Sequence, residues 1–158
     1  MAKAGGAGTK QGKSGRKGPR QAFLEQNSHK APEKIMYDLR TILDMKKETA
    51  ARLAARFFFR KKEFGKALIF YKDAREYEMA GLIIMEKLGL EKKKQSEELS
   101  GIYIQALRDY KAGGLEEWEY PKILKGLFNM EIIMRQHGAE FTKEVGKAIG
   151  KMKKGREF

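Results

Sequence analysis

The sequence predicts an all-α protein, built from sequential antiparallel helical hairpins behind a disordered basic N-terminal tail. Apolar residues recur at helical spacing through most of the chain, and no segment of useful length alternates between apolar and polar residues as a half-buried strand does. Prolines, which interrupt helices, number only three in 158 residues. Helices of this kind bury their apolar stripes against one another, so we expect roughly six or seven helices in sequential pairs.

The N-terminal segment 1–31 is predicted to be a tail and linker. Its first twenty residues contain six glycines and no acidic residue, and they cannot bury apolar surface. A polar linker, 21–31, follows, in which Phe23 and Leu24 are expected to anchor the tail to the body. The tail's basic side chains are Lys3, Lys10, Lys13, Arg16, Lys17 and Arg20. They favour a polyanionic partner, and a tail that only aids solubility is the alternative.

The first predicted helix begins at Pro32, because proline followed by an acidic residue, here Glu33, is typical of a first helical turn. Two apolar stripes follow, one of Ile35, Leu39, Ile42 and Leu43 and one of Leu53, Ala54, Phe57 and Phe58. The polar residues 46–48 separate the two stripes. They leave open whether one long helix or two helices cover this segment.

Four further helical faces are predicted before the C-terminus. They cover 63–88, 99–110, 121–137 and 141–154, and the first three end at Gly89, Gly113 and Gly138. A charged connection or first helical turn is expected over 91–98. The helical domain is therefore predicted to span 32–154, with 155–158 as a C-terminal end.

The excess positive charge is concentrated at the two ends of the chain. Residues 141–158 carry six basic against two acidic side chains, while the body is nearly balanced within a formal net charge of +13. The last predicted helix is amphipathic, with Lys143, Lys147, Lys151 and Lys154 along one side. Of these, Lys147, Lys151 and Lys154 join the basic residues of the tail as candidate nucleic-acid contacts.

Several kinds of chemistry are not expected. The chain has no cysteine, and His29 and His137 have no ligand cluster beside them, so we expect no metal site. Residues 7–14, AGTKQGKS, satisfy a permissive phosphate-loop pattern, but neither a strand before them nor a helix after them is predicted. No apolar run approaches about 18 residues, and no secretory signal is expected. We therefore expect a cytoplasmic protein without enzymatic activity, cofactor or membrane contact.

The run AARFFFRKKEFGKALIFYKDA, within 48–80, is more specific than a generic helix pattern. It resembles a tetratricopeptide repeat, with small residues at Ala55, Ala67 and Ala74 and aromatic residues at Phe58, Phe64 and Tyr71. Two positions depart from that pattern, since Ala51 replaces a tryptophan-like residue and Lys62 replaces a turn glycine. No clean second copy follows. The resemblance implies a repeat-like array of helical hairpins, and a small unrelated helical bundle is the alternative.

The same resemblance implies a peptide-binding groove lined by the first helix of the repeat. Its lining residues would be Thr49, Arg52, Arg56, Phe59 and Arg60. Independently of the resemblance, the three arginines recur every four residues and form one ridge on a helix. Arginine forks bind carboxylates and phosphates equally well, whereas a ridge paired with neighbouring acids would be only a solvated face.

Two functions remain. The first is a non-enzymatic scaffold that docks through its basic termini on structured RNA or a ribonucleoprotein such as the ribosome. The second is a protein–protein interaction adaptor that binds an acidic peptide through Arg52, Arg56, Phe59 and Arg60. The first is favoured, because glycines beside the basic residues of the tail allow close approach to an irregular polyanion.

Overall fold

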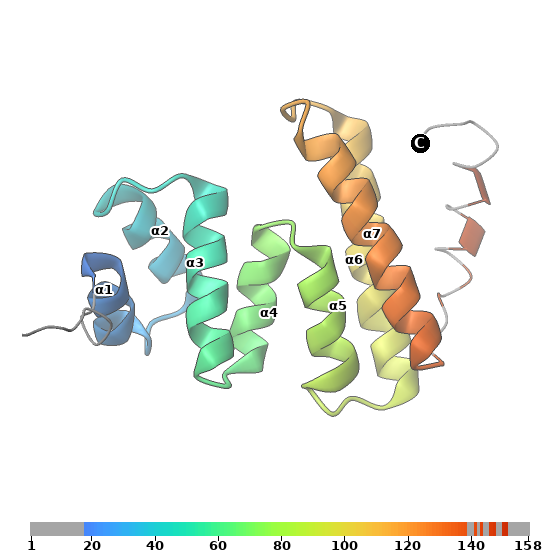
Figure 1. The fold of residues 1–158 in the computed structure, drawn as a ribbon, viewed down its shortest axis with the longest axis horizontal. Helices are drawn as coiled ribbons and strands as arrows, with labels where there is room; N and C mark the ends of the chain where they lie inside the picture. The colour runs from blue at the N-terminus through green and yellow to red at the C-terminus, as the bar shows by residue number, and fades with distance from the viewer. Residues whose placement is uncertain (1–17, 139–140, 142, 144–145, 148–149, 152–158) are drawn as a thin grey trace, which may run out of the picture. The chain divides into compact units, whose positions relative to one another are not determined.

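The computed structural model describes residues 18–138, 141, 143, 146–147 and 150–151. Among these residues it contains helices and no strand, which confirms the predicted all-α fold (Figure 1). The helices are α1 (Pro19–Asn27), α2 (Pro32–Thr41), α3 (Lys47–Arg60), α4 (Phe64–Asp73), α5 (Tyr77–Glu86), α6 (Lys92–Ala112) and α7 (Glu119–Gln136). The chain divides into two compact units, 1–45 and 46–158, which are described separately below.

Helix α1 lies where a polar linker was expected, so the prediction for 21–31 is wrong over most of its length. Pro19 occupies the start of the helix, where its missing N–H costs nothing, and the following residues are good helix formers. Leu24 is fully buried. The Asn27 side chain donates a hydrogen bond of 2.8 Å to the Phe23 carbonyl and secures the last turn.

Helices α2 and α3 are separate, which answers the question that the two apolar stripes left open. Helix α2 begins at Pro32, as predicted, and buries Ile35 and Leu39. The chain then breaks over 42–46, where Asp44 takes a left-handed φ of 50°. Aspartate is one of the few residues other than glycine that tolerate this conformation.

Helices α3 and α4 form the hairpin at the centre of the tetratricopeptide-like run. Ala54, Ala55 and Ala67 are fully buried, and such small residues let two helix backbones approach closely. The Phe58 ring stacks on the Phe70 ring at 5.5 Å between centroids. The turn contains Lys62 at a left-handed φ of 62°, in the position that usually holds a glycine.

The turn between α4 and α5 repeats this geometry, with Arg75 at a left-handed φ of 56°. In both turns the two residues after the helix donate backbone hydrogen bonds to carbonyls of its last turn. Beyond this turn, α5 packs closely on α7, since Gly81 faces Met130 and Gly126 faces Tyr77. Helix α6 begins at Lys92, so most of the expected charged connection over 91–98 is helical.

Phe58→Ala should lower the free energy of unfolding by about 3–5 kcal/mol, because it removes a fully buried ring and leaves a cavity against Phe70. Phe128→Ala is the matched control, since that ring is 60% exposed and its removal should cost less than about 0.5 kcal/mol. Urea unfolding followed by far-UV circular dichroism measures both. Equal costs for the two variants would contradict the packing described for the α3–α4 hairpin.

Candidate functional site

Four charged residues, Glu48, Arg75, Asp109 and Glu119, form what we term the Arg75 cluster. Arg75 Nη1 lies 2.8 Å from Glu119 Oε1 at the start of α7 and 3.5 Å from Glu48 Oε2 at the start of α3. Arg75 Nε lies 3.9 Å from Asp109 Oδ2 in α6. Because three carboxylates on three helices share one guanidinium, the cluster ties the α4–α5 turn to the ends of those helices.

The two glutamates of the cluster titrate in opposite directions. A hydrogen bond of 2.8 Å from the Glu116 N–H to Glu119 Oε2 lowers the pKa of Glu119, and Arg75 lowers it further. Burial raises the pKa of Glu48, and the neighbouring Glu119 carboxylate adds to that rise. Glu48 Oε2 is buried without a hydrogen bond. The distances to Arg75 Nη1 agree with this difference, since Glu119 Oε1 lies at 2.8 Å and Glu48 Oε2 at 3.5 Å.

The predicted ridge consists of Arg52, Arg56 and Arg60, and Arg52 already forms an ion pair with Glu76. Its Nε donates a hydrogen bond of 3.1 Å to Glu76 Oε1, and Lys122 Nζ lies 3.8 Å from Glu76 Oε2. A partner anion would have to compete with Glu76 for this guanidinium. Arg52 thus helps to hold the α4–α5 turn against α3.

Arg56 and Arg60, the other two arginines of the ridge, are exposed and have no ion pair within the described part of the chain. Both lie close enough to Tyr71 to lower its pKa, although burial, the largest influence, raises it. Phe59 is half-buried and packs edge-on against Phe64 and Tyr71, at 5.3 and 6.4 Å between centroids. Two free guanidinium groups therefore stand beside a small aromatic surface.

These arginines belong to a larger basic surface, which we term the basic edge. The α3–α4 turn and the α5–α6 loop lie on the same side of the second unit, at the bottom of the view in Figure 1. Lys87 Nζ lies 5.7 Å from the centre of the Phe64 ring and links the two loops. The basic edge consists of Arg56, Arg60, Lys61, Lys62, Lys66, Lys87, Lys92 and Lys93.

Three acids, Glu63, Glu86 and the exposed Glu91, lie beside the eight cations of the basic edge. Glu63 lies 3.8 Å from Lys66, and Glu86 is occupied by His137 at 3.1 Å. At the opposite end of the same unit, the acids of the Arg75 cluster and Glu116 and Glu117 lie among basic residues such as Arg52, Lys111 and Lys122, so the two signs nearly balance. Uncompensated positive charge is therefore concentrated at the end that holds the α3–α4 turn.

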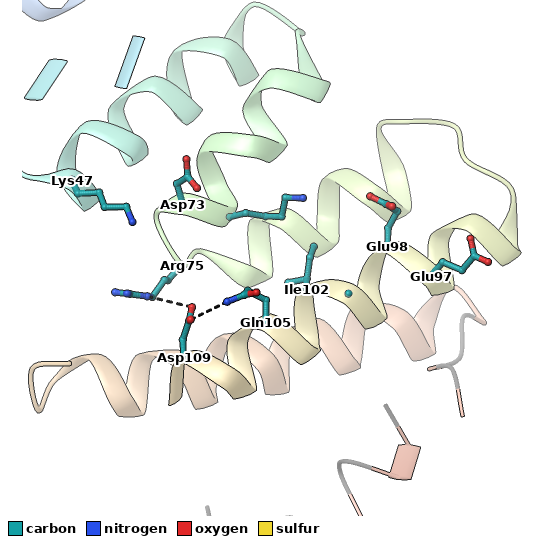
Figure 2. A pocket seen from close by; sticks show the side chains of 10 residues that line it. Lys47, Asp73, Arg75, Glu97, Glu98, Ile102, Gln105 and Asp109 are labelled. Carbon is teal, nitrogen blue, oxygen red and sulfur yellow. Dashed lines mark hydrogen bonds and ion pairs between the residues drawn. The ribbon is translucent and has the colours of Figure 1, made fainter. Parts of the chain in front are cut away.

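A charged cavity of about 540 Å³ lies between α6 and the hairpin of α3 and α4 (Figure 2). Lys47, Lys72 and Asp73 line the hairpin side, and Glu97, Glu98, Gly101 and Ile102 line the α6 side. Figure 2 shows Arg75, Asp109 and Gln105 joined at one end, where the Gln105 amide donates a hydrogen bond of 3.0 Å to Asp109.

The remaining predicted contacts belong to the two ends of the chain. Arg20 is exposed at the start of α1, and Lys147 and Lys151 are exposed in the C-terminal segment. The other predicted contacts lie outside the described residues: Lys3, Lys10, Lys13, Arg16, Lys17 and Lys154. Thr49, predicted to line the groove, is exposed in the first turn of α3.

Sequence reasoning missed most of the basic edge and all of the Arg75 cluster. The run Arg60–Lys61–Lys62 was visible as a local signal, but nothing local associates it with Lys87, Lys92 and Lys93. The Arg75 cluster joins residues up to 71 positions apart. Such long-range pairs require the helix packing to be known.

Comparison with protein-family models, curated proteins and solved structures finds no match to this chain. In the part of the chain that the structure describes, no helix is long and apolar enough to cross a membrane. Within the same residues, acidic and histidine side chains form no group of three or more that could hold a metal ion.

Glu48→Gln should stabilise the protein at neutral pH, by roughly 0.5–1 kcal/mol. A carboxyl whose pKa is raised on folding stabilises the fold at low pH, and this contribution is lost as the pH rises from the ordinary value of 4.5 through the folded pKa. Glutamine cannot ionise, so the gain should grow as the pH rises through that window and vanish below it. Thermal unfolding across a pH series measures the difference.

Glu117→Gln is the control, since it removes the same charge from an exposed residue near the same helix end. We expect a smaller effect without the same rise with pH. If Glu48→Gln destabilises the protein at every pH, the carboxylate attracts Arg75 more strongly than Glu119 repels it, and the direction given for its pKa is wrong.

Proposed function

We propose that this chain is a non-enzymatic, cytoplasmic scaffold that docks on structured RNA within a ribonucleoprotein particle such as the ribosome. The observation that carries the proposal is the basic edge. Its cations come from two neighbouring loops and the helix turns that adjoin them, and most of them have no acid partner among the described residues. A surface of this kind attracts a polyanion and releases the counterions around it.

Most cations of the basic edge are not paired with a carboxylate, which supports RNA binding there. A cation already paired with a carboxylate must lose that partner before it binds phosphate, which offsets the gain. In the described part of the chain, Arg56, Arg60 and Lys62 have no such partner, whereas Arg52 and Arg75 are held by acids. Lys61 lies 5.3 Å from the Phe57 ring, a contact that leaves its charge available.

Structured RNA fits the shape of this surface better than a flat anionic surface does. The basic edge follows two loops at one end of the unit. Each of its arginines can donate two parallel hydrogen bonds to one phosphate group. The excess of cations on the basic edge, against nearly balanced charge at the opposite end, orients the molecule as it approaches the RNA. The basic termini, through Arg20, Lys147 and Lys151 and the tail, would add contacts around this centre.

Replacing Arg60, Lys61 and Lys62 together with glutamine should weaken binding to a stem-loop RNA at least tenfold at moderate salt. For each phosphate that the variant no longer neutralises, the slope of log affinity against log salt should fall by about 0.7 to 0.9, so three phosphates should lower it by about two to three. Fluorescence anisotropy over a salt series, with the full chain, measures both quantities.

The matched control replaces Arg40, Lys46 and Lys125 with glutamine, which removes the same charge from exposed positions outside the basic edge. It should change the affinity and the slope much less. Equal reductions in the two variants would mean that only net charge matters. If both variants keep the affinity and the slope of the parent chain, the proposal is wrong. A variant with glutamine at Lys3, Lys10, Lys13 and Lys17 measures, in the same assay, how much the tail contributes to RNA affinity.

An adaptor that binds an acidic peptide is the second candidate. The observation in its favour is the placement of Arg56 and Arg60 beside Tyr71 and the half-buried Phe59. The α3–α4 hairpin, with its buried alanines, agrees with the tetratricopeptide-like pattern on which that function rests. An acidic peptide that binds the full chain and loses affinity in Phe59→Ala, a change outside the basic edge, while RNA binding is little changed, would favour the adaptor.

A further inference from the structure

Gly101, in the middle of α6, has no packing role. Helices α5, α6 and α7 each contain a single glycine inside the helix. A Cβ atom at Gly81 would lie 2.9 Å from Met130 Cγ, and one at Gly126 would lie 3.5 Å from Tyr77, so close helix packing accounts for both. At Gly101, in the middle of α6, a Cβ atom would meet nothing within 4 Å.

Glycine inside a helix is costly, because it loses the most backbone freedom and contributes no side chain. Gly101 is exposed and has an ordinary helical conformation, so neither burial nor a left-handed φ requires it. It lies in the charged cavity, beside Ile102. The missing side chain leaves the backbone of α6 open to whatever occupies that cavity.

The unpaired charges of the cavity are opposite on its two sides, because Asp73, which lies beside the two lysines, already has an interaction of its own. Lys47 and Lys72 have no ion pair within the described residues. Across from them, Glu97 is exposed and equally unpaired there, and Glu98 is only 3.9 Å from Lys94 on its own helix. An occupant that satisfies both sides must carry both a cation and an anion.

These charges exclude the ligand of the basic edge. The phosphates of RNA would meet Glu97 and Glu98, so this cavity is no extension of the RNA surface. Small-molecule sites are lined predominantly by apolar and aromatic side chains, and Ile102 is the only large apolar residue of this lining. A protein segment matches better, because its backbone can lie on Gly101 while its side chains reach the two walls.

We infer that the cavity between α6 and the α3–α4 hairpin binds a protein segment of mixed charge. Its basic side chain faces Glu97 and Glu98, its acidic side chain faces Lys47 and Lys72, and its backbone passes over Gly101. The volume of about 540 Å³ lies within the range of ligand-binding pockets. This site is independent of the proposed RNA surface and would make the chain a bridge between RNA and a protein.

The test uses a blocked peptide of alternating lysine, glycine and glutamate, titrated into the ¹⁵N-labelled full chain. We expect saturable shifts of the Gly101 and Ile102 amides. Analogues in which every charged residue is lysine, or every one is glutamate, should bind at least tenfold more weakly. The absence of a saturable shift with the mixed peptide, or equal binding by an analogue of a single charge, would overturn the proposal.

Gly101→Ala should raise the thermal midpoint, since alanine favours the helix, and should weaken peptide binding at least tenfold. Gly65→Ala is the matched control, because Gly65 is also helical and open but lies outside the cavity; it should leave peptide binding unchanged. Unchanged peptide binding in Gly101→Ala would overturn the placement of the backbone.

Reversing the charges on both sides of the cavity tests whether the peptide binds at this site or only responds to the net charge of the protein. Glu97→Lys with Glu98→Lys should abolish peptide binding, and adding Lys47→Glu with Lys72→Glu should restore it, because the peptide then binds with its charges reversed. Failure of that rescue would contradict the assignment of the two walls. RNA affinity measured on the Gly101→Ala variant should match that of the parent chain, so failure here and failure of the RNA proposal are distinguishable.

Discussion

The ion pairs of Arg75 are the constraint on which the second unit depends. One guanidinium in a turn of three residues holds carboxylates from the starts of α3 and α7 and from the C-terminal half of α6. Glutamate at the start of a helix also interacts favourably with the helix dipole, and Glu119 in addition accepts the Glu116 N–H. Glu119, the carboxylate at 2.8 Å from the arginine, therefore also stabilises the start of α7.

This arrangement separates charge within one unit. Carboxylates gather at the end where Arg75 can neutralise them, and Arg52 and Lys122 are held there by Glu76. The opposite end keeps its cations exposed on two neighbouring loops. Free and paired cations therefore differ: the paired ones connect helices of the fold, and the free ones are the cations on which the proposed RNA surface rests. Between the two ends, the cavity beside Gly101 presents both signs of charge.

The sequence predicted the features that depend on local spacing. Apolar stripes located α2, α3, α6 and α7, because the 3.6-residue period of a helix is visible in neighbouring residues. The single face expected over 63–88 is two helices, α4 and α5, because the chain turns at 74–76. It failed at α1, where a single buried leucine makes a pattern too weak to distinguish a short helix from a linker. The arginine ridge was correctly placed on α3, but its pairing was not foreseen, because Glu76 lies 24 positions from Arg52. The basic edge and the Gly101 cavity required knowing which loops and helices lie side by side.

The most direct test of this account is to map where a stem-loop RNA contacts the ¹⁵N-labelled full chain. Within residues 46–138, we expect the largest amide shifts at 60–66 and 87–93, the two loops of the basic edge, and little change at 109–119. If the largest shifts fall at 109–119, or spread evenly over the unit, the separation of charge does not direct binding and the central claim is wrong.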